Sequence, residues 1–261
     1  MATPREQLAN LLRQARIDAG YGSHGALARK LNVSRPVVTK AENPAHPVPS
    51  DGILAAWAGA TGVGLDVLIE LARRAKSGTP DWFLPYRQAE AEASILRCWS
   101  PLLVPGVLQC ESYMRAVLSV EDYSAEQLDE LVAARLERQA VIGRAYLTAI
   151  IDQHVIHRLI GSAAVMAEQC THLANMAERP RIELHVIPEG ANVGLWGALY
   201  LATRDNAVTV CLPALEDVTS TAGALVGKAT WAFERILGAA MPRAESLDLI
   251  RTAEERWKAQ I

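Results

Sequence analysis

Residues 23–42 read SHGALARKLNVSRPVVTKAE and contain two short helical patterns on either side of a turn. Ser23 suits the N-cap of the first helix, predicted over 25–31, because a serine hydroxyl can accept a hydrogen bond from the first helical turn. Asn32 follows, and asparagine tolerates the left-handed backbone that a tight turn requires. The pattern therefore predicts a helix, a turn and a second helix.

The second helix is predicted over 35–42, with Ser34 as its N-cap. Pro36 lies in the first turn, where a missing N–H has no helical partner to lose. The inward face is apolar and comprises Val37, Val38 and Ala41. The outward face carries side chains that can reach base edges and phosphates, namely Arg35, Thr39 and Lys40. Two short helices joined by a tight turn, the second one basic outside, are typical of a helix-turn-helix.

Three further helices complete an all-α domain over residues 1–76. Apolar residues at three-and-four spacing predict a helix over 5–19. A loop with three prolines follows the second short helix at 43–49, and two apolar-faced helices are predicted over 51–60 and 65–75. We therefore expect five helices, of which the second and third form the motif.

The formal charge of −3 is unevenly divided along the chain. The first 76 residues hold ten Lys or Arg against six Asp or Glu, a net charge of +4, and the remainder has a net charge of −7. A basic N-terminal part on an acidic body is compatible with nucleic-acid binding through the N-terminal part alone.

The N-terminal part resembles the Xre family of phage-repressor-like regulators. The resemblance rests on Leu12-Arg13 with Arg16, Leu27-Ala28, Asn32-Val33-Ser34, Val38-Thr39-Lys40, Glu42 and Pro49. It implies that Arg16 and Glu42 form a structural pair that ties the first helix to the end of the recognition helix. It also places His24 where the family often has a phosphate-contacting glutamine, so His24, Ser34, Arg35, Thr39 and Lys40 are the predicted DNA-binding residues.

Residues 77–90 are predicted to be a linker, because prolines and small residues follow Lys76. An α+β regulatory or interaction domain is predicted over 91–261. Its expected helices include 88–98, 124–142 and 163–177. Its expected strands are 146–151, 181–187, 195–203 and 208–212, with a fifth over 215–218, in a small and mostly antiparallel sheet. Arg204-Asp205-Asn206 should make a hairpin turn.

A set of residues and short motifs is spread over the second half: Trp99, Pro105-Gly106-Val107-Leu108-Gln109, Tyr113, Arg115, Arg135, Arg138-Gln139, Gly161, Val165-Met166, Gln169, Leu173, Val186-Ile187-Pro188, Gly190, Gly197, Ser246 and Ile250. Through these residues, the second half resembles the domain of unknown function that follows an Xre-type helix-turn-helix in many actinobacterial regulators. The resemblance implies a possible small protein partner and supplies neither a reaction nor a ligand.

Several classes of function are not expected. Cys98, Cys110, Cys170 and Cys211 lie far apart and predict buried free thiols rather than a zinc or redox motif. His154 and His157 lack a third ligand nearby, so we expect no metal and no cofactor. No apolar stretch approaches a membrane span and no signal peptide is evident, which predicts a cytoplasmic protein. Arg135 and Arg138 are expected to pair with Glu130 and Glu137 or to be solvated.

The sequence thus predicts a sequence-specific DNA-binding transcriptional regulator, not an enzyme. Its partners would be double-stranded DNA and a second copy in a homodimer, since one short helix reads few base pairs. The C-terminal domain would mediate dimerisation, partner binding or effector sensing. The first alternative is a protein-partner-binding module whose helix-turn-helix does not bind DNA, and the second, less favoured one is an enzyme.

Overall fold

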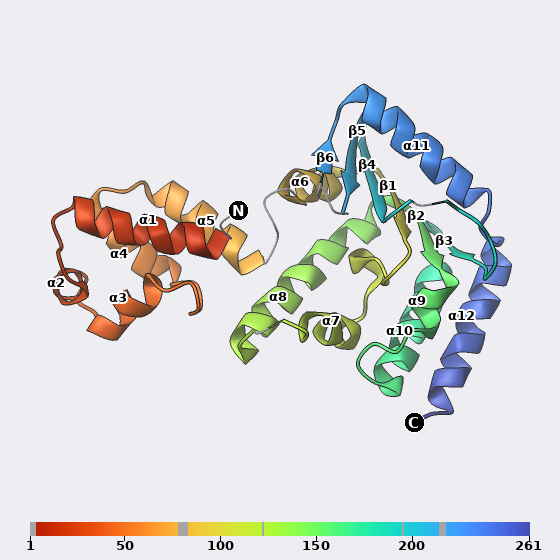
Figure 1. Ribbon diagram of the computed structural model, residues 1–261, viewed down its shortest axis with the longest axis horizontal. Helices are drawn as coiled ribbons and strands as arrows, with labels where there is room; N and C mark the ends of the chain where they lie inside the picture. Colours follow the sequence, from red (N-terminus) through yellow and green to blue (C-terminus); the bar gives the residue numbers. More distant parts are fainter. Residues whose placement is uncertain (1–3, 78–82, 122, 195, 214–217) are drawn as a thin grey trace. The chain divides into compact units, whose positions relative to one another are not determined.

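A computed structural model describes residues 4–77, 83–121, 123–194, 196–213 and 218–261. The chain divides into two compact units at residues 81 and 82, with residues 123–131 grouped with the first unit. The two units are considered separately below, and their elements are labelled in Figure 1.

The N-terminal unit contains the five predicted helices. They are α1 (Pro4–Asp18), α2 (His24–Lys30), α3 (Arg35–Ala41), α4 (Asp51–Thr61) and α5 (Leu65–Ser77). Each begins and ends within two residues of its predicted bounds. Their apolar faces meet in one core whose fully buried members include Leu8, Leu12, Leu27, Val38, Leu54, Trp57 and Leu68.

The turn between α2 and α3 has the predicted local structure. The Ser23 hydroxyl accepts a hydrogen bond from the Ala26 N–H at 3.2 Å. Asn32 adopts a left-handed backbone with φ 54°. Ser34 occupies the N-cap position of α3, although its side chain makes no capping hydrogen bond in this described segment.

The C-terminal unit combines helices with one sheet. Its helices are α6 (Leu84–Glu92), η2 (Gly106–Leu108), α7 (Glu111–Leu118), α8 (Ala125–Arg138, grouped with this unit from Val132), η3 (Gln139–Gly143), α9 (Gln153–His157), α10 (Ala163–Ala177), α11 (Gly223–Leu237) and α12 (Arg243–Lys258). Its strands are β1 (Ile95–Ser100), β2 (Tyr146–Asp152), β3 (Ile182–Ile187), β4 (Leu199–Arg204), β5 (Ala207–Leu212) and β6 (Val218–Ser220).

The sheet has six strands in the order β3-β2-β1-β4-β5-β6 and is mixed. The pairs β1–β2 and β2–β3 are parallel, whereas β1–β4, β4–β5 and β5–β6 are antiparallel. The prediction of a mostly antiparallel sheet is therefore wrong. It failed because residues 95–98 were assigned to a helix, which removed β1, the central strand. The helices that connect β1 to β2 and β2 to β3 are the crossovers that parallel pairing requires.

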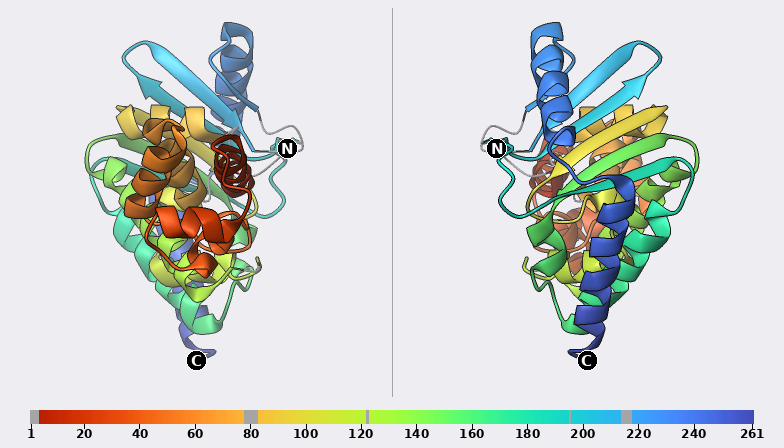
Figure 2. Two further views of the ribbon diagram at one scale, coloured as in Figure 1. Left: turned by 90° about the vertical axis from the view of Figure 1, so that its left-hand side faces the viewer. Right: turned by 90° about the vertical axis from the view of Figure 1, so that its right-hand side faces the viewer.

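Helices cover both faces of this sheet (Figures 1 and 2). The larger core lies on one face, where α7, α9, α10 and α12 contribute side chains. The smaller core lies on the other face, where α11 packs against Trp99, Ile150 and Leu201 among others. The two faces are thus covered unequally.

Two boundaries in the C-terminal half differ from the sequence analysis. Residues 84–92 form α6, and its Tyr86 and Glu90 are 2% and 3% exposed. The predicted linker over 77–90 therefore extends too far, because residues 84–90 form a helix that packs into the C-terminal core. Of the predicted fifth strand, residues 215–217 lie outside the described residues, and β6 begins at residue 218.

The hairpin prediction is confirmed. Arg204 pairs with Ala207 across an antiparallel ladder, and Asp205 between them has φ 51°. None of the helices in the described ranges is long and apolar enough to cross a membrane.

Candidate nucleic-acid interface

Helix α3 has one buried face and one exposed face. Val38 and Ala41 are 0% and 3% exposed and pack into the helical core. Arg35, Thr39 and Lys40 are exposed on the other side. The three predicted base and phosphate contacts therefore share one accessible surface of a helix that is fixed from behind.

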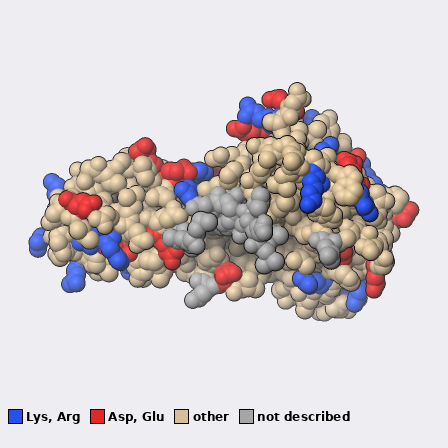
Figure 3. Space-filling view, turned by 45° about the horizontal axis from the view of Figure 1, so that its top comes forward, with Lys and Arg blue, Asp and Glu red and all other residues tan. Residues whose placement is uncertain are grey.

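The surroundings of α3 are basic. Residues 19–41 contain Arg29, Lys30, Arg35 and Lys40, and all four side chains are exposed. The same stretch contains no Asp or Glu. Figure 3 shows Lys and Arg side chains at the end of the N-terminal unit where Figure 1 places α2 and α3. A surface of this kind attracts a polyanion such as the DNA backbone.

Arg16 and Glu42 form a buried bidentate ion pair. The Arg16 Nε and Nη2 groups donate to the two carboxylate oxygens of Glu42 at 2.5 and 2.9 Å. The Glu42 side chain is 1% exposed, and its hydrogen bond raises the pKa of Arg16. Arg13 also lies 3.7 Å from this carboxylate. The pair joins α1 to the residue that follows α3, which fixes the end of that helix.

His24 is held within the protein by both ring nitrogens. Its Nε2 lies 3.1 Å from Glu42 Oε2, and its Nδ1 lies 3.2 Å from Thr39 Oγ1. Because an ionised carboxylate only accepts, His24 donates through Nε2. The side chain is still 30% exposed. His24 therefore links two of the other predicted site residues rather than standing free at the start of α2.

Arg5 was missed by the sequence analysis. Its guanidinium donates to the backbone carbonyl oxygens that follow or end α3, those of Lys40, Ala41, Asn43 and His46, at 2.6 to 3.2 Å. Carbonyls at a helix C-terminus lack helical partners, and an arginine can satisfy them. Desolvation of the half-buried guanidinium lowers the pKa of Arg5. No pattern in α1 signals this contact, because it depends on the path of the loop after α3.

In the C-terminal unit, three glutamines hold the irregular segment 101–110. Gln169 accepts from one backbone N–H of this segment and donates to one of its carbonyls, each at 2.8 Å. Gln139 donates to two further carbonyls at 3.2 and 2.7 Å, and Gln109 to one at 2.7 Å. Gln109, Gln139 and Gln169 are among the residues on which the resemblance of the C-terminal half rests. Their role here is structural, since buried backbone groups need partners.

Arg138 forms a second buried pair, with Glu90 of α6. Its Nη2 donates to Glu90 Oε2 at 2.6 Å, its Nε donates to the other carboxylate oxygen, and the guanidinium lies 5.1 Å from the centre of the Phe83 ring. Burial disfavours the cation, but attraction to Glu90 outweighs it and raises the pKa of Arg138. The expectation that Arg138 pairs with an acid of its own helix or is solvated is therefore wrong, because the end of α8 packs against α6.

Beside this pair lies a cavity of ≈ 10 Å³, lined by Tyr86, Glu90, Leu96, Arg97, Cys98, Pro105, Gly106, Val107, Arg138, Leu147 and Tyr200. That volume accommodates about one water molecule. It cannot hold an organic effector without a rearrangement.

The four cysteines are free and buried, as predicted. Burial raises the pKa of Cys98 and of Cys170 to about 12, so both thiols stay protonated at neutral pH. Among the described residues, no three His, Cys, Asp or Glu side chains lie together in a way that could hold a metal ion.

These observations define a two-part protein, in which a helical unit compatible with a helix-turn-helix precedes an α+β unit with a mixed six-stranded sheet. The family model for the domain of unknown function DUF5753 matches residues 83–252, and the chain belongs to this family. The match covers the C-terminal unit from α6 into α12. Neither the curated proteins nor the solved structures compared with the chain contain a match.

Proposed function

We propose that the protein is a sequence-specific DNA-binding transcriptional regulator of the Xre type, and that α3 is its recognition helix. One observation carries the proposal: Arg35, Thr39 and Lys40 project from the exposed face of a helix that is fixed behind and at its end. A helix that is already fixed loses little backbone entropy on binding, which favours a specific complex.

Each residue receives a role from its chemistry. Arg35, in the first turn of α3, would donate to guanine O6 and N7 in the major groove. Thr39 would contact a base edge one turn further on, and Lys40 would contact a phosphate. His24 would position Thr39 through its Nδ1 contact and reach a phosphate with its exposed edge. Ser34 would donate to the backbone where α3 enters the groove.

The proposed operator has two-fold symmetry, read by a homodimer. A helix of seven residues reaches only a few base pairs, so two copies are needed for a site that is rare in a genome. The C-terminal unit would provide the dimer contacts, and its surface could also accept a small protein partner.

The test is recovery and sequencing of genomic DNA fragments bound by the purified protein at low salt. The Arg35→Ala, Lys40→Ala double variant should lose the enrichment. An Arg204→Ala, Arg251→Ala double variant removes the same charge from exposed positions of the C-terminal unit and should keep it. The proposal is supported if the wild type and the control variant enrich a two-fold motif and the Arg35→Ala, Lys40→Ala variant does not. Absence of any enriched motif refutes it and favours a module that binds a protein partner instead.

A further inference from the structure

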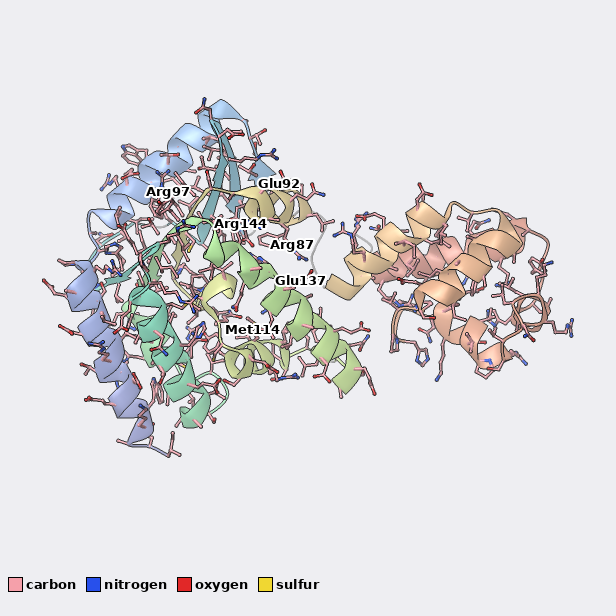
Figure 4. All side chains as sticks on the ribbon, turned by 180° about the vertical axis from the view of Figure 1, so that it is seen from behind. Arg87, Glu92, Arg97, Met114, Glu137 and Arg144 are labelled. Atoms are coloured by element: carbon pink, nitrogen blue, oxygen red, sulfur yellow. The ribbon has the colours of Figure 1, made fainter. Side chains whose placement is uncertain are left out.

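One imidazole ring connects a buried carboxylate to a hydroxyl group on the exposed face of α3. His24 is the first residue of α2, which packs against α3, and the side chains of both helices are drawn in Figure 4. Its Nε2 lies 3.1 Å from Oε2 of Glu42, and its Nδ1 lies 3.2 Å from Oγ1 of Thr39. Glu42 is 1% exposed, whereas Thr39 is exposed on the proposed recognition surface. The state of the ring therefore acts on an atom that faces the DNA.

The direction of these hydrogen bonds follows from the chemistry of the three groups. The carboxylate of Glu42 only accepts, so His24 donates through Nε2. Arg16 already pairs with this carboxylate through two hydrogen bonds, and Arg13 lies 3.7 Å from it, so it has its counter-charge without an imidazolium. A neutral ring has a single proton, and with that proton on Nε2 the ring accepts at Nδ1. In the second contact, the hydroxyl of Thr39 is therefore the donor.

Thr39 has one hydroxyl proton, and the protein offers two acceptors for it. One is Nδ1 of His24 and the other is the carbonyl oxygen of Arg35, each 3.2 Å from Oγ1. A third bond, to a base, cannot use this proton unless both internal contacts are given up. The oxygen keeps its lone pairs, which can accept. Toward a base edge, Thr39 is thus an acceptor and not a donor.

We propose that His24 is a positioning residue that determines specificity: it makes Thr39 an acceptor and so selects a base with an amino group in the major groove. Such bases are adenine, through N6, and cytosine, through N4, whereas guanine and thymine present carbonyl oxygens there. This role rests on the proposed function, since it names one class of base within the DNA that α3 would read. His24 acts on that base only through Thr39.

Two substitutions at His24 separate the direction of the hydrogen bonds from the packing of the ring. His24→Gln keeps the direction, because its amide nitrogen can donate to Glu42 while its amide oxygen accepts from Thr39. His24→Lys supplies donors only. Its ammonium would donate to Thr39 and release the hydroxyl proton, so that Thr39 could donate to a base as readily as accept. His46→Lys makes the same exchange at a partly exposed position in the loop after α3 and is the matched control.

The experiment measures the ratio of affinities for two duplexes at about pH 8 and fixed salt. They differ by inversion of one base pair, at the motif position whose preference is lost in Thr39→Val. Changes in overall charge or in folded fraction alter both affinities alike and cancel from the ratio. The wild type, His24→Gln and His46→Lys should prefer the orientation with the amino group at Thr39 by roughly three- to tenfold. In His24→Lys the ratio should fall to within about twofold of one.

Nitrogen-15 NMR of the imidazole rings provides a second test, made without DNA. At about pH 8, the ring of His24 should carry its proton on Nε2. A proton on Nδ1 overturns the inference, as does a wild-type ratio in His24→Lys or a preference for guanine or thymine at Thr39. Loss of the preference in both His24 variants overturns it as well, since packing alone would then explain the effect. A wild type that enriches no motif refutes the proposed function and this role with it, whereas the other outcomes leave DNA binding standing.

Discussion

Each unit of the chain buries one arginine–glutamate pair, and the two pairs differ in their surroundings. Arg16 and Glu42 join α1 to the end of α3, and the carboxylate also contacts His24, which is 30% exposed. Glu90 and Arg138 join α6 to the end of α8, next to Tyr86, Tyr200 and the thiol of Cys98. Burial there raises the pKa of Tyr200 to about 12. Both pairs are largely buried, with side-chain exposures of 8% and 1% for Arg16 and Glu42 and of 20% and 3% for Arg138 and Glu90. The first pair adjoins the exposed face of α3, whereas the second adjoins the core of the C-terminal unit.

The comparison teaches that a buried ion pair does not by itself mark a functional site. The relevant difference is what the pair holds in place. Glu42 follows α3, a helix with an exposed basic face. Arg138 lies near the irregular segment 101–110, whose backbone groups form hydrogen bonds with glutamine side chains of the same unit. Of the two pairs, only the first therefore lies beside an exposed basic surface.

The largest expected effect comes from breaking either pair. Glu42→Ala and Glu90→Ala should each lower the free energy of unfolding of their own unit by about 3–5 kcal/mol, because each leaves a buried arginine without a counter-charge. Urea unfolding, resolved by hydrogen exchange of the amides in each unit, measures this. Glu92→Ala, which removes an exposed partner of Arg204, should cost less than about 1 kcal/mol. Equal losses in all three variants would contradict the comparison.

A smaller effect is expected from Arg5→Ala. The variant leaves four carbonyls at the end of α3 without their donor, which should destabilise the N-terminal unit by about 1.5–3 kcal/mol. The same change should speed hydrogen exchange at the end of α3 more than in α4. Arg73→Ala removes an arginine from an exposed pair with Glu70 and serves as the control. Unchanged exchange in α3 would show that the Arg5 contacts do not hold the helix.

The smallest effect concerns pH. Desolvation lowers the pKa of His157 and of His172 in the C-terminal unit below the usual 6.5. The unfolded chain then binds protons that the folded unit does not, so stability is greatest above about pH 6.5 and falls as the pH drops through that value. Carboxylates titrate below this range. The melting temperature should fall between pH 7.5 and pH 5.5, and less so in His172→Gln. An identical fall in that variant would remove His172 from the explanation.

The N-terminal fold was predictable because its signals are local. The helical spacing of Leu8 and Leu12 in α1, the N-cap at Ser23 and the turn at Asn32 each act within a few residues. The central strand β1 was not predictable in this way. Four of its six residues are buried, and the other two, Ile95 and Arg97, are partly buried. Both faces of the strand therefore contact other parts of the protein. The period-two alternation that distinguishes a strand from a helix is thereby lost.

The candidate site likewise contains residues that local spacing predicts and contacts that it does not predict. Arg35, Thr39 and Lys40 could be placed on one exposed face from helical spacing alone. The Arg5 contacts and the two-sided hydrogen bonding of His24 depend on how segments 15 to 41 residues apart meet, which spacing does not encode. Glu90 and Arg138, 48 residues apart, were missed for the same reason.

The most direct test of the central claim is the affinity of the wild type and of Arg35→Ala for a fluorescent duplex carrying the enriched motif, and for a scrambled duplex, at fixed salt. We predict that Arg35→Ala weakens binding to the motif by about 1–3 kcal/mol, roughly 5- to 150-fold. It should change binding to the scrambled duplex far less. Equal affinity of the two proteins for the motif would contradict the assignment of α3 as the recognition helix.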